Sequence, residues 1–208
     1  MKKKPEMVLV TGFLGAGKTT MMLKLIDYFQ RLGKRCAIII NEIGEEGIDN
    51  RKMRAMGYDV LDLFGGCVCC TLKVTLEATI HHLLNEAENI DVILFEPSGM
   101  GEASSMIDSI ENCGYQRSEI INCFIVDPLR IALYQKRLNK LFLDGVGVAD
   151  IVLISKMDVV VESDFRIAEK MIDEVDSNLP CLGVDFISHR GEEQITKWLE
   201  RRMGDVTE

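Results

Sequence analysis

Residues 12–19 read Gly12-Phe13-Leu14-Gly15-Ala16-Gly17-Lys18-Thr19 and lie just after the apolar run 7–10. They match the phosphate-binding pattern G-x-x-x-x-G-K-[ST] in the strand–loop–helix setting that it requires. Glycines allow successive backbone N–H groups to turn toward a phosphate, and a helix expected near 18–32 directs its positive end at the same anion. A chance Gly-rich turn is the alternative, but both flanks argue against it. The segment predicts a nucleoside triphosphate site.

The side chains of this loop have separate expected roles. Lys18 supplies a positive charge for the outer phosphates, and the Thr19 hydroxyl is a ligand for Mg²⁺. The other nucleotide-binding residues expected in this segment are Gly12, Gly15, Ala16, Gly17 and Thr20.

Along the rest of the chain, apolar β-branched runs alternate with longer amphipathic segments. Strands are expected near 7–11, 36–41, 58–63, 91–95, 120–126, 150–154 and 182–187, and helices near 18–32, 72–88, 102–111, 128–143, 164–177 and 191–202. Gly33 can end the first helix, and Ser163 or Asp164 can cap the fifth. The alternation predicts a single α/β domain over 1–208, with a doubly wound, mostly parallel sheet, helices on both faces, and ligands at the carboxyl ends of the strands.

Composition limits the possible partners and compartment. The 208 residues carry a formal net charge of −9, which argues against nucleic acid as the main partner. No apolar stretch approaches a transmembrane span, and no apolar segment of a signal peptide follows Lys2-Lys3-Lys4, so we expect no membrane partner. The odd count of seven cysteines does not suggest a disulfide framework, and we expect a cytoplasmic location.

The strand near 150–154 leads into Ser155-Lys156-Met157-Asp158, which is similar to the Asn-Lys-x-Asp guanine motif. The Asp158 carboxylate can accept two hydrogen bonds from guanine, and the Lys156 stem can lie across the purine. Ser155 has fewer hydrogen-bond partners than the usual amide. An ordinary strand-end loop is the alternative, but the position favours GTP over ATP. Ser188 and His189 lie where GTPases place a second base-contacting loop.

Two further segments are expected near the phosphates. The strand near 91–95 ends in Glu96-Pro97-Ser98-Gly99, where Glu96 can hold Mg²⁺ through water and the Gly99 amide can approach the γ-phosphate. Residues 41–49 form an acidic loop with two glycines, which includes Glu45 and Asp49. It is either a solvated charge run or, as its context favours, a switch that orders around Mg²⁺ and the γ-phosphate.

The segment Gly65-Gly66-Cys67-Val68-Cys69-Cys70 places three thiols within four residues. Thiolates select Zn²⁺ or related late transition metals, and three of them leave a tetrahedral ion one ligand short, which makes the site exchangeable. A redox or disulfide role is the competing interpretation. The other cysteines, Cys36, Cys113, Cys123 and Cys181, suit the role of plain buried hydrophobes.

Together these motifs resemble the CobW-like family of P-loop GTPases, metallochaperones related to the nickel-inserting GTPases of hydrogenase and urease maturation. The resemblance rests on 12–20, 41–49, 65–70, 96–99 and 155–158, in family order over essentially the whole chain. It implies that Cys67, Cys69 and Cys70 bind a metal, with Glu45 as a helper, while Thr19 and Glu96 serve Mg²⁺. It also implies that Lys18, Thr19, Asp49 and Glu96 carry out GTP hydrolysis, and that the GTP or GDP state controls metal release. Zn²⁺ is the first expectation, with Ni²⁺ and Co²⁺ as alternatives.

The chain also departs from the family pattern. Members usually carry a further C-terminal domain, which we expect to be absent here, and many have a His-rich segment, whereas this chain has three histidines. We expect His81 and His82 to be surface residues. No glutamine or arginine is recognisable in a catalytic position, so intrinsic hydrolysis should be slow.

The leading hypothesis is a GTP-hydrolysing metallochaperone or cofactor-assembly factor that serves a client metalloenzyme or corrinoid protein. The alternative is a non-catalytic GTP-dependent module that regulates such an enzyme or senses redox state. A small-molecule kinase has less support because no Arg-rich lid is present. The sequence leaves the oligomeric state open, a homodimer included.

Overall fold

The computed structural model describes residues 4–40, 60–62, 69–85, 90–99 and 101–204. In this part of the chain, seven strands form one parallel sheet of order β3-β2-β4-β1-β5-β6-β7. The strands are β1 (Glu6–Gly12), β2 (Cys36–Ile40), β3 (Val60–Asp62), β4 (Val92–Glu96), β5 (Ile120–Val126), β6 (Ile151–Ile154) and β7 (Cys181–Gly183). The predicted α/β fold with a parallel, doubly wound sheet is confirmed.

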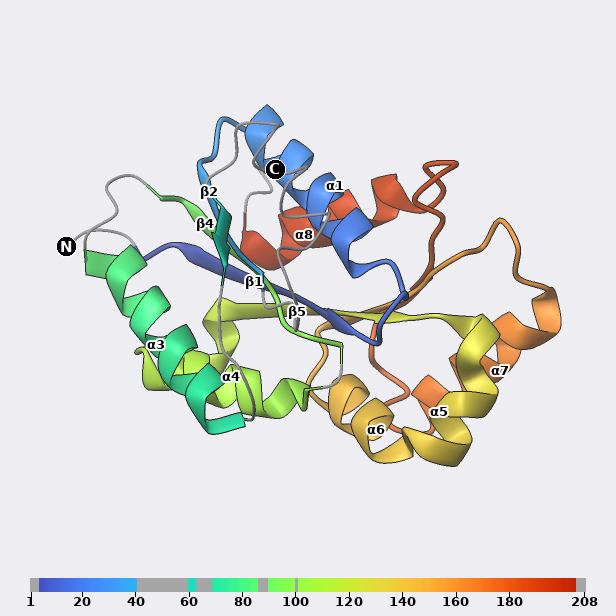
Figure 1. Cartoon of the computed structure of the whole chain (residues 1–208). Helices are drawn as coiled ribbons and strands as arrows, with labels where there is room; N and C mark the ends of the chain where they lie inside the picture. The colour runs from blue at the N-terminus through green and yellow to red at the C-terminus, as the bar shows by residue number, and fades with distance from the viewer. Residues whose placement is uncertain (1–3, 41–59, 63–68, 86–89, 100, 205–208) are drawn as a thin grey trace.

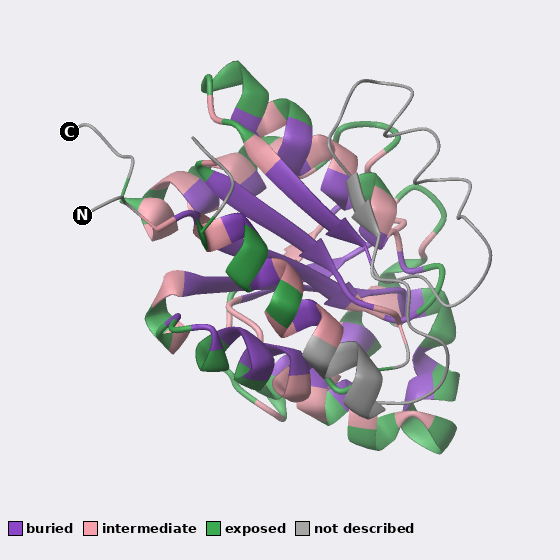
Figure 2. Ribbon diagram, turned by 60° about the vertical axis from the view of Figure 1, so that its left-hand side comes forward, coloured by how far each residue is buried: buried purple, intermediate pink, exposed green. Residues whose placement is uncertain are grey.

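Helices cover both faces of the sheet (Figure 1). They are α1 (Lys18–Arg31), α3 (Cys69–Asn85), α4 (Ala103–Asn112), α5 (Ile131–Arg137), α6 (Asn139–Gly147), α7 (Glu162–Asp173) and α8 (Glu192–Met203), with short 3₁₀ turns η1 (Arg117–Glu119) and η2 (Pro128–Arg130). Helices α1 and α8 pack on one face, and α3 to α7 lie on the other. The central strands are buried along their length (Figure 2), as expected of strands covered on both sides.

The core on the α1 and α8 face is continuous, whereas the core on the other face has two parts. One cluster joins alternate residues of β1, β2, β4, β5 and β6 to α1 and α8, with Phe29 and Leu199 fully buried. On the opposite face, a second cluster packs α3 and α4 against β1, β2 and β4. A third packs α5, α6 and α7 against β5 and β6 and includes Phe124 and Phe142.

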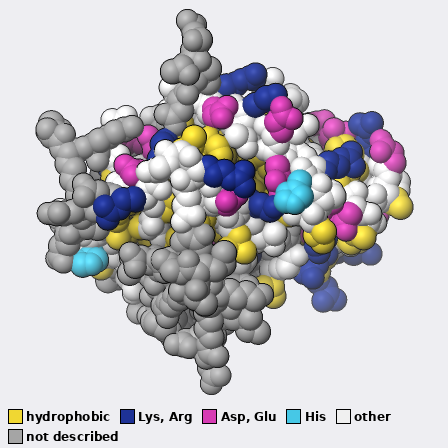
Figure 3. Space-filling model, turned by 90° about the horizontal axis from the view of Figure 1, so that it is seen from above, with side chains coloured by type: hydrophobic (Ala, Val, Ile, Leu, Met, Phe, Trp, Pro, Cys, Tyr) yellow, Lys and Arg dark blue, Asp and Glu magenta, His cyan; other side chains and the backbone are white. Residues whose placement is uncertain are grey.

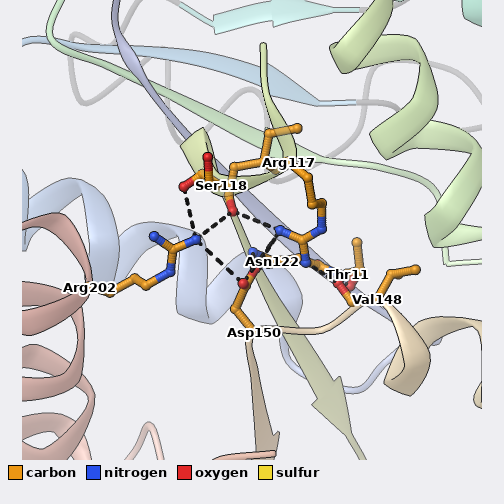
Figure 4. Close-up of polar contacts among 8 residues, drawn as sticks. Thr11, Arg117, Ser118, Asn122, Val148, Asp150 and Arg202 are labelled. Atoms are coloured by element: carbon orange, nitrogen blue, oxygen red, sulfur yellow. Dashed lines mark hydrogen bonds and ion pairs between the residues drawn. The ribbon is translucent and has the colours of Figure 1, made fainter.

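A chain of polar contacts lies between the second and third clusters (Figure 4). Thr11 Oγ1 donates to Asn122 Oδ1 at 2.7 Å, and both residues are buried. The Asn122 N–H donates to Asp150 Oδ2 at 2.8 Å, and Asp150 also accepts from Arg117 at 3.1 Å. Arg202, at the end of α8, lies 3.6 Å from Asp150. These polar contacts therefore connect β1, the strand that leads into the phosphate loop, to residues at the opposite edge of the sheet.

The structure corrects the segment predicted as one helix over 128–143. It is divided into η2, α5 and α6, with a break at Leu138, whose φ and ψ are −119° and 19°. The break changes the helical phase, so both Tyr134 and Phe142 are buried, with their rings stacked 5.8 Å apart. Periodicity alone did not predict it because each half is amphipathic by itself.

Element ends show two further corrections and one confirmation. Helix α7 begins at Glu162 after Val161, without a side-chain cap, so the predicted caps Ser163 and Asp164 are wrong. Asp164 instead lies in the first turn, where its charge favours the helix dipole. Strand β7 is shorter than the predicted 182–187 because the chain turns at Asp185. Gly33 follows the end of α1 with φ of +69°, as predicted.

The surface over α1 and α8 mixes basic and acidic side chains with hydrophobic ones (Figure 3). A groove of about 560 Å³ lies between the two helices and is lined by residues that include Tyr28, Phe186 and His189. Among the residues that the structure describes, no helix has both the length and the hydrophobicity needed to cross a membrane.

Candidate functional site

The phosphate loop begins at the carboxyl end of β1, between β4 and β5. Gly12 has φ of +134°, and a Cβ there would lie 2.4 Å from the Ile125 carbonyl oxygen. Gly17 has φ of +109° and immediately precedes α1. These two glycines are therefore required by backbone conformation, and at Gly12 also by the close approach of β5.

The predicted phosphate-site side chains come together around Glu96. Thr19 Oγ1 donates a hydrogen bond to Glu96 Oε1 at 3.2 Å, and Lys18 Nζ lies 3.8 Å from the same oxygen. Lys18 Nζ also donates to the Phe13 carbonyl at 3.3 Å. Lys18 and Glu96 are only 6% and 8% exposed, so their charges interact with little screening by water. The arrangement places a cation beside two oxygen groups that suit Mg²⁺.

Gly99 lies directly against the phosphate loop. A Cβ on Gly99 would lie 2.6 Å from the Leu14 nitrogen, 2.9 Å from the Phe13 carbonyl carbon and 3.1 Å from Lys18 Nζ. Backbone atoms cannot yield as a flexible side chain can, so glycine is needed for this approach. The structure thus brings the segment after β4 to the place where its sequence position predicted it.

The loop after β6 is held by contacts to the end of β5. Ser155 is buried, and its hydroxyl donates to the Val126 carbonyl at 3.1 Å. Lys156 has an unusual φ of +62°, and its Nζ lies 2.6 Å from Asp127 Oδ2. Asp158 is exposed. Ser155 is therefore engaged with the protein backbone, while Asp158 faces solvent at the same edge.

The second predicted base loop is arranged differently from expectation. Ser188 and His189 are both exposed, and His189 Nδ1 lies 2.9 Å from Glu192 Oε2 and 3.1 Å from Lys24 Nζ. Among the described residues, the side-chain contacts of His189 are thus with α1 and α8 and not with the loop after β6. His81 and His82 are exposed, as predicted.

Sequence reasoning missed Asp185, a carboxylate that is 2% exposed. Its two oxygens accept hydrogen bonds from the Ile187 N–H at 2.8 Å and the Ser188 N–H at 3.0 Å. Hydrogen bonding from Ser188, with further help from the Ile187 N–H, lowers the pKa of Asp185 below its usual value. An Asp directly after a short strand is a known turn signal, which could have indicated it.

Sequence reasoning also missed Asp127, which is 1% exposed and directly follows β5. Asp127 Oδ1 accepts from the Leu129 N–H at 3.1 Å, and Oδ2 pairs with Lys156 and, at 3.4 Å, with Arg130 Nε. An acid after a buried strand was the signal that identified Glu96, and the same reasoning applied to Asp127 would have found it.

The cysteine segment is described only in part. Helix α3 begins at Cys69 and includes Cys70, and it follows β3 by a short connection before the chain enters β4. In such a parallel unit, the helix starts at the carboxyl edge of the sheet, which is the edge of the phosphate loop. Cys67, Glu45 and Asp49 lie outside the described residues. Within the described ranges, no three His, Cys, Asp or Glu residues are grouped as a metal site.

The other four cysteines are free thiols in protected environments. Burial raises the pKa of Cys36 and Cys113 to about 11, and that of Cys123 and Cys181 to about 12. Their thiols therefore stay protonated at neutral pH, which disfavours both metal binding and nucleophilic reaction. The predicted role as buried hydrophobes agrees with the burial of Cys113 and Cys123, whereas Cys36 and Cys181 are only partly buried.

Comparison with known proteins gives a family match over most of the chain. The family described as "CobW/HypB/UreG, nucleotide-binding domain" matches residues 6–182. The zinc chaperone YeiR of Escherichia coli (strain K12) is 31% identical over 155 residues, which are 72% of this chain and 46% of that protein. The zinc chaperone CobW of Pseudomonas aeruginosa is 27% identical over 226 residues, covering 91% of this chain and 58% of that protein. The chain thus spans about half the length of these relatives.

Solved structures agree on the fold. HypB from Helicobacter pylori in complex with nickel aligns with a TM-score of 0.69 and 17% identity, over 99% of this chain and 90% of that chain. A Zn(II)-bound triple mutant of the YjiA GTPase aligns with a TM-score of 0.59 and 22% identity, over 88% and 58% of the two chains. With a family match over residues 6–182 and a shared fold, the chain belongs to the CobW/HypB/UreG family of P-loop nucleotide-binding domains.

Proposed function

We propose that this chain is the GTP-binding and GTP-hydrolysing domain of a metallochaperone, acting in the cytoplasm. The observation that carries the proposal is the grouping of Lys18, Thr19 and Glu96 against the phosphate loop, at the same sheet edge where α3 begins with two cysteines. Zn²⁺ is the proposed cargo, because the relatives YeiR and CobW are named zinc chaperones. Ni²⁺ and Co²⁺ remain chemical alternatives.

The reaction proposed at the phosphate end is attack of water on the γ-phosphate of GTP. Lys18 neutralises charge on the outer phosphates, as its buried position beside Glu96 allows. The Thr19 hydroxyl and Glu96, which lie 3.2 Å apart, offer the oxygen ligands that Mg²⁺ prefers, and that ion would add further charge neutralisation. Asp49 from the acidic segment is proposed to complete the site, and the Gly99 N–H to bind the γ-phosphate.

The base is proposed to be guanine, held at the loop after β6. Asp158 is exposed and able to accept from guanine, while Asp127 holds the Lys156 ammonium so that its stem can lie along the purine. Ser155 is proposed to shape this loop through its bond to Val126. Ser188 and His189 stay a weaker proposal, because the contacts of His189 lie with α1 and α8.

The metal is proposed to bind Cys67, Cys69 and Cys70, with Glu45 as a further ligand. Cys69 and Cys70 lie in the first turn of α3, and in general the positive end of a helix favours thiolates. The protein would then hand the metal to a client metalloenzyme or corrinoid protein. A homodimer is a proposed but unspecified arrangement.

Metal titrations of the native chain, loaded with GDP or with a non-hydrolysable GTP analogue, test this proposal. We expect Zn²⁺ affinity to differ between the two states by roughly 5- to 150-fold, as is typical of coupled sites. The triple replacement of Cys67, Cys69 and Cys70 by serine should abolish tight binding and leave GDP binding intact. The matched control replaces Cys36 and Cys181, which lie outside the cluster, and should bind Zn²⁺ normally.

Two results would contradict the proposal. Equal Zn²⁺ affinity with GDP and with the GTP analogue would show that metal binding and nucleotide binding are not coupled. Tight GTP retention without turnover, together with a reversible disulfide between Cys67 and Cys70, would instead favour the regulatory or redox-sensing alternative.

A further inference from the structure

Arg130 connects the phosphate loop to the loop that follows β6. Its Nη1 donates to the Leu14 carbonyl at 2.7 Å, within the phosphate loop. Its Nε lies 3.4 Å from Asp127 Oδ2, the oxygen that also holds Lys156 Nζ at 2.6 Å. One arginine and one carboxylate thus join two segments that lie more than a hundred residues apart in sequence.

The shared carboxylate is held in place by the protein. Asp127 is 1% exposed, and its other oxygen accepts the Leu129 N–H at 3.1 Å. The Asp127 N–H donates to the Tyr134 hydroxyl at 3.3 Å, and Tyr134 is itself fully buried. A carboxylate fixed on several sides transmits a displacement of one partner to the other, whereas an exposed one would swing independently.

The Arg130 guanidinium also lies against Gly15 of the phosphate loop. Arg130 Nη2 is 3.2 Å from the position that a Cβ would occupy on Gly15, which has φ of +75°. Nη2 makes no hydrogen bond to any residue that the structure describes. Gly15 can adopt many backbone conformations in the absence of restraint, so a contact that fixes its neighbour Leu14 restricts the loop.

We propose that Arg130 is a positioning residue that couples the base loop to the phosphate loop and thereby slows nucleotide release. This inference rests on the proposed function, since it assigns the two loops to the two ends of one nucleotide. When Lys156 lies on the base, its ammonium stays on Asp127, Asp127 keeps Arg130 in place, and Arg130 keeps Leu14 in its phosphate-binding conformation. Loss of any one of these contacts frees Leu14 and thereby speeds release of the nucleotide.

The test is a double-mutant cycle on the rate of GDP release from the full chain, measured with a fluorescent GDP. Arg130→Ala removes the contact with Leu14, and Lys156→Met removes the ammonium while it keeps an apolar stem for the base. We expect each single variant to release GDP about 10-fold faster, because each change leaves the buried Asp127 carboxylate without one of its partners, which acts mainly on dissociation. The double variant should release GDP no faster than the faster single variant, because both changes break the same chain of contacts.

The control is Arg137→Ala, an exposed arginine at the end of α5, the helix that follows Arg130, and this variant should release GDP at the native rate. Arg130 is 44% exposed on its side chain, so Arg130→Ala should keep the native thermal midpoint, and a merely structural role would lower it. Arg130→Lys keeps the charge but cannot bridge both partners, so it should restore only part of the native rate.

The inference is overturned if Arg130→Ala leaves the release rate unchanged, or if the two single effects multiply in the double variant. If either result occurs in a protein that binds GDP and couples GDP binding to metal binding, this inference fails while the proposed function stands. If the native chain prefers ADP over GDP, the proposed function fails, but the same cycle run with ADP still decides the role of Arg130. A native chain that binds neither nucleotide overturns both.

Discussion

The two ends of the candidate nucleotide site are built in different ways. At the phosphate end, one continuous loop after β1 meets the end of β4, and the predicted residues Lys18, Thr19, Glu96 and Gly99 lie close together. At the base end, three loops that follow β5, β6 and β7 meet, and the buried organisers are Asp127 and Asp185. A site centred on one continuous loop is largely encoded locally, whereas a site made from three loops depends on buried groups that fix each backbone.

The largest expected effect is that of Lys18→Ala at the phosphate end. Removal of a buried positive charge should lower kcat for GTP by about 10³-fold, because charge developing on the phosphates is no longer neutralised. Phosphate release under saturating GTP measures it. Lys24→Ala, on the same helix but paired with Glu192, is the control and should retain turnover. Unchanged turnover in Lys18→Ala would mean that the phosphate end is not the reaction site.

Gly99→Ala tests whether the phosphate end depends on close backbone packing. The added Cβ would lie 2.6 Å from the Leu14 nitrogen, so the loop must shift, and we expect about a 100-fold loss of kcat/KM, as small misplacements at reacting centres produce. Gly101→Ala is the matched control, because a Cβ there would lie 3.8 Å from its nearest neighbour. Equal activity of the two variants would contradict this account of the loop.

At the base end, Asp158→Asn should change which base is preferred. The amide cannot accept both guanine donors, so we expect GTP affinity to fall roughly 10- to 100-fold, with xanthosine triphosphate competing better than in the native chain. Competition against fluorescent GDP measures both. Equal competition by ATP and GTP in the native protein would show that Asp158 does not read guanine.

The smallest expected effect is that of Asp185→Asn, which acts on the loop after β7. The single amide oxygen of Asn cannot replace both carboxylate oxygens that accept from the Ile187 and Ser188 N–H groups, so we expect a lower midpoint of urea denaturation. The folded-state pKa of Asp185 is lowered, so its contribution is present at neutral pH and above the unfolded-state pKa. It should be lost as the pH falls through the folded-state pKa, and a native chain as unstable as the variant at pH 7 would contradict this.

The grouping of the residues proposed for the phosphate end could be predicted from the sequence for a physical reason. Gly12, Gly17, Lys18 and Thr19 adopt their conformations through local backbone rules, and Glu96 and Gly99 follow because parallel strands end at one edge. The same reasoning placed the strands and most helices. The resemblance to the CobW-like family is confirmed by the match over residues 6–182.

The remaining features depend on tertiary contacts that no local pattern reveals. The break at Leu138 exists so that Tyr134 and Phe142 can both be buried, which periodicity within either half does not show. Asp127 and Asp185 hold their loops because tertiary packing buries both carboxylates, and no local pattern shows that burial. His189 contacts Lys24 of α1 and Glu192 of α8. These helices are far apart in sequence, so no local pattern shows that they lie side by side.

The buried pair Thr11–Asn122 has a consequence for the way the domain opens. Because this polar pair separates the second and third core clusters, the helices on that face form two blocks, α3 with α4 and α5 with α6 and α7. The continuous cluster beneath α1 and α8 joins all the central strands. The two blocks stay joined where the Ser104 N–H of α4 donates to Asp144 of α6 at 3.2 Å and Lys140 of α6 pairs with Glu102 at 2.7 Å. Local opening of α3, the helix that begins at the cysteines, therefore reaches α5 to α7 only through α4.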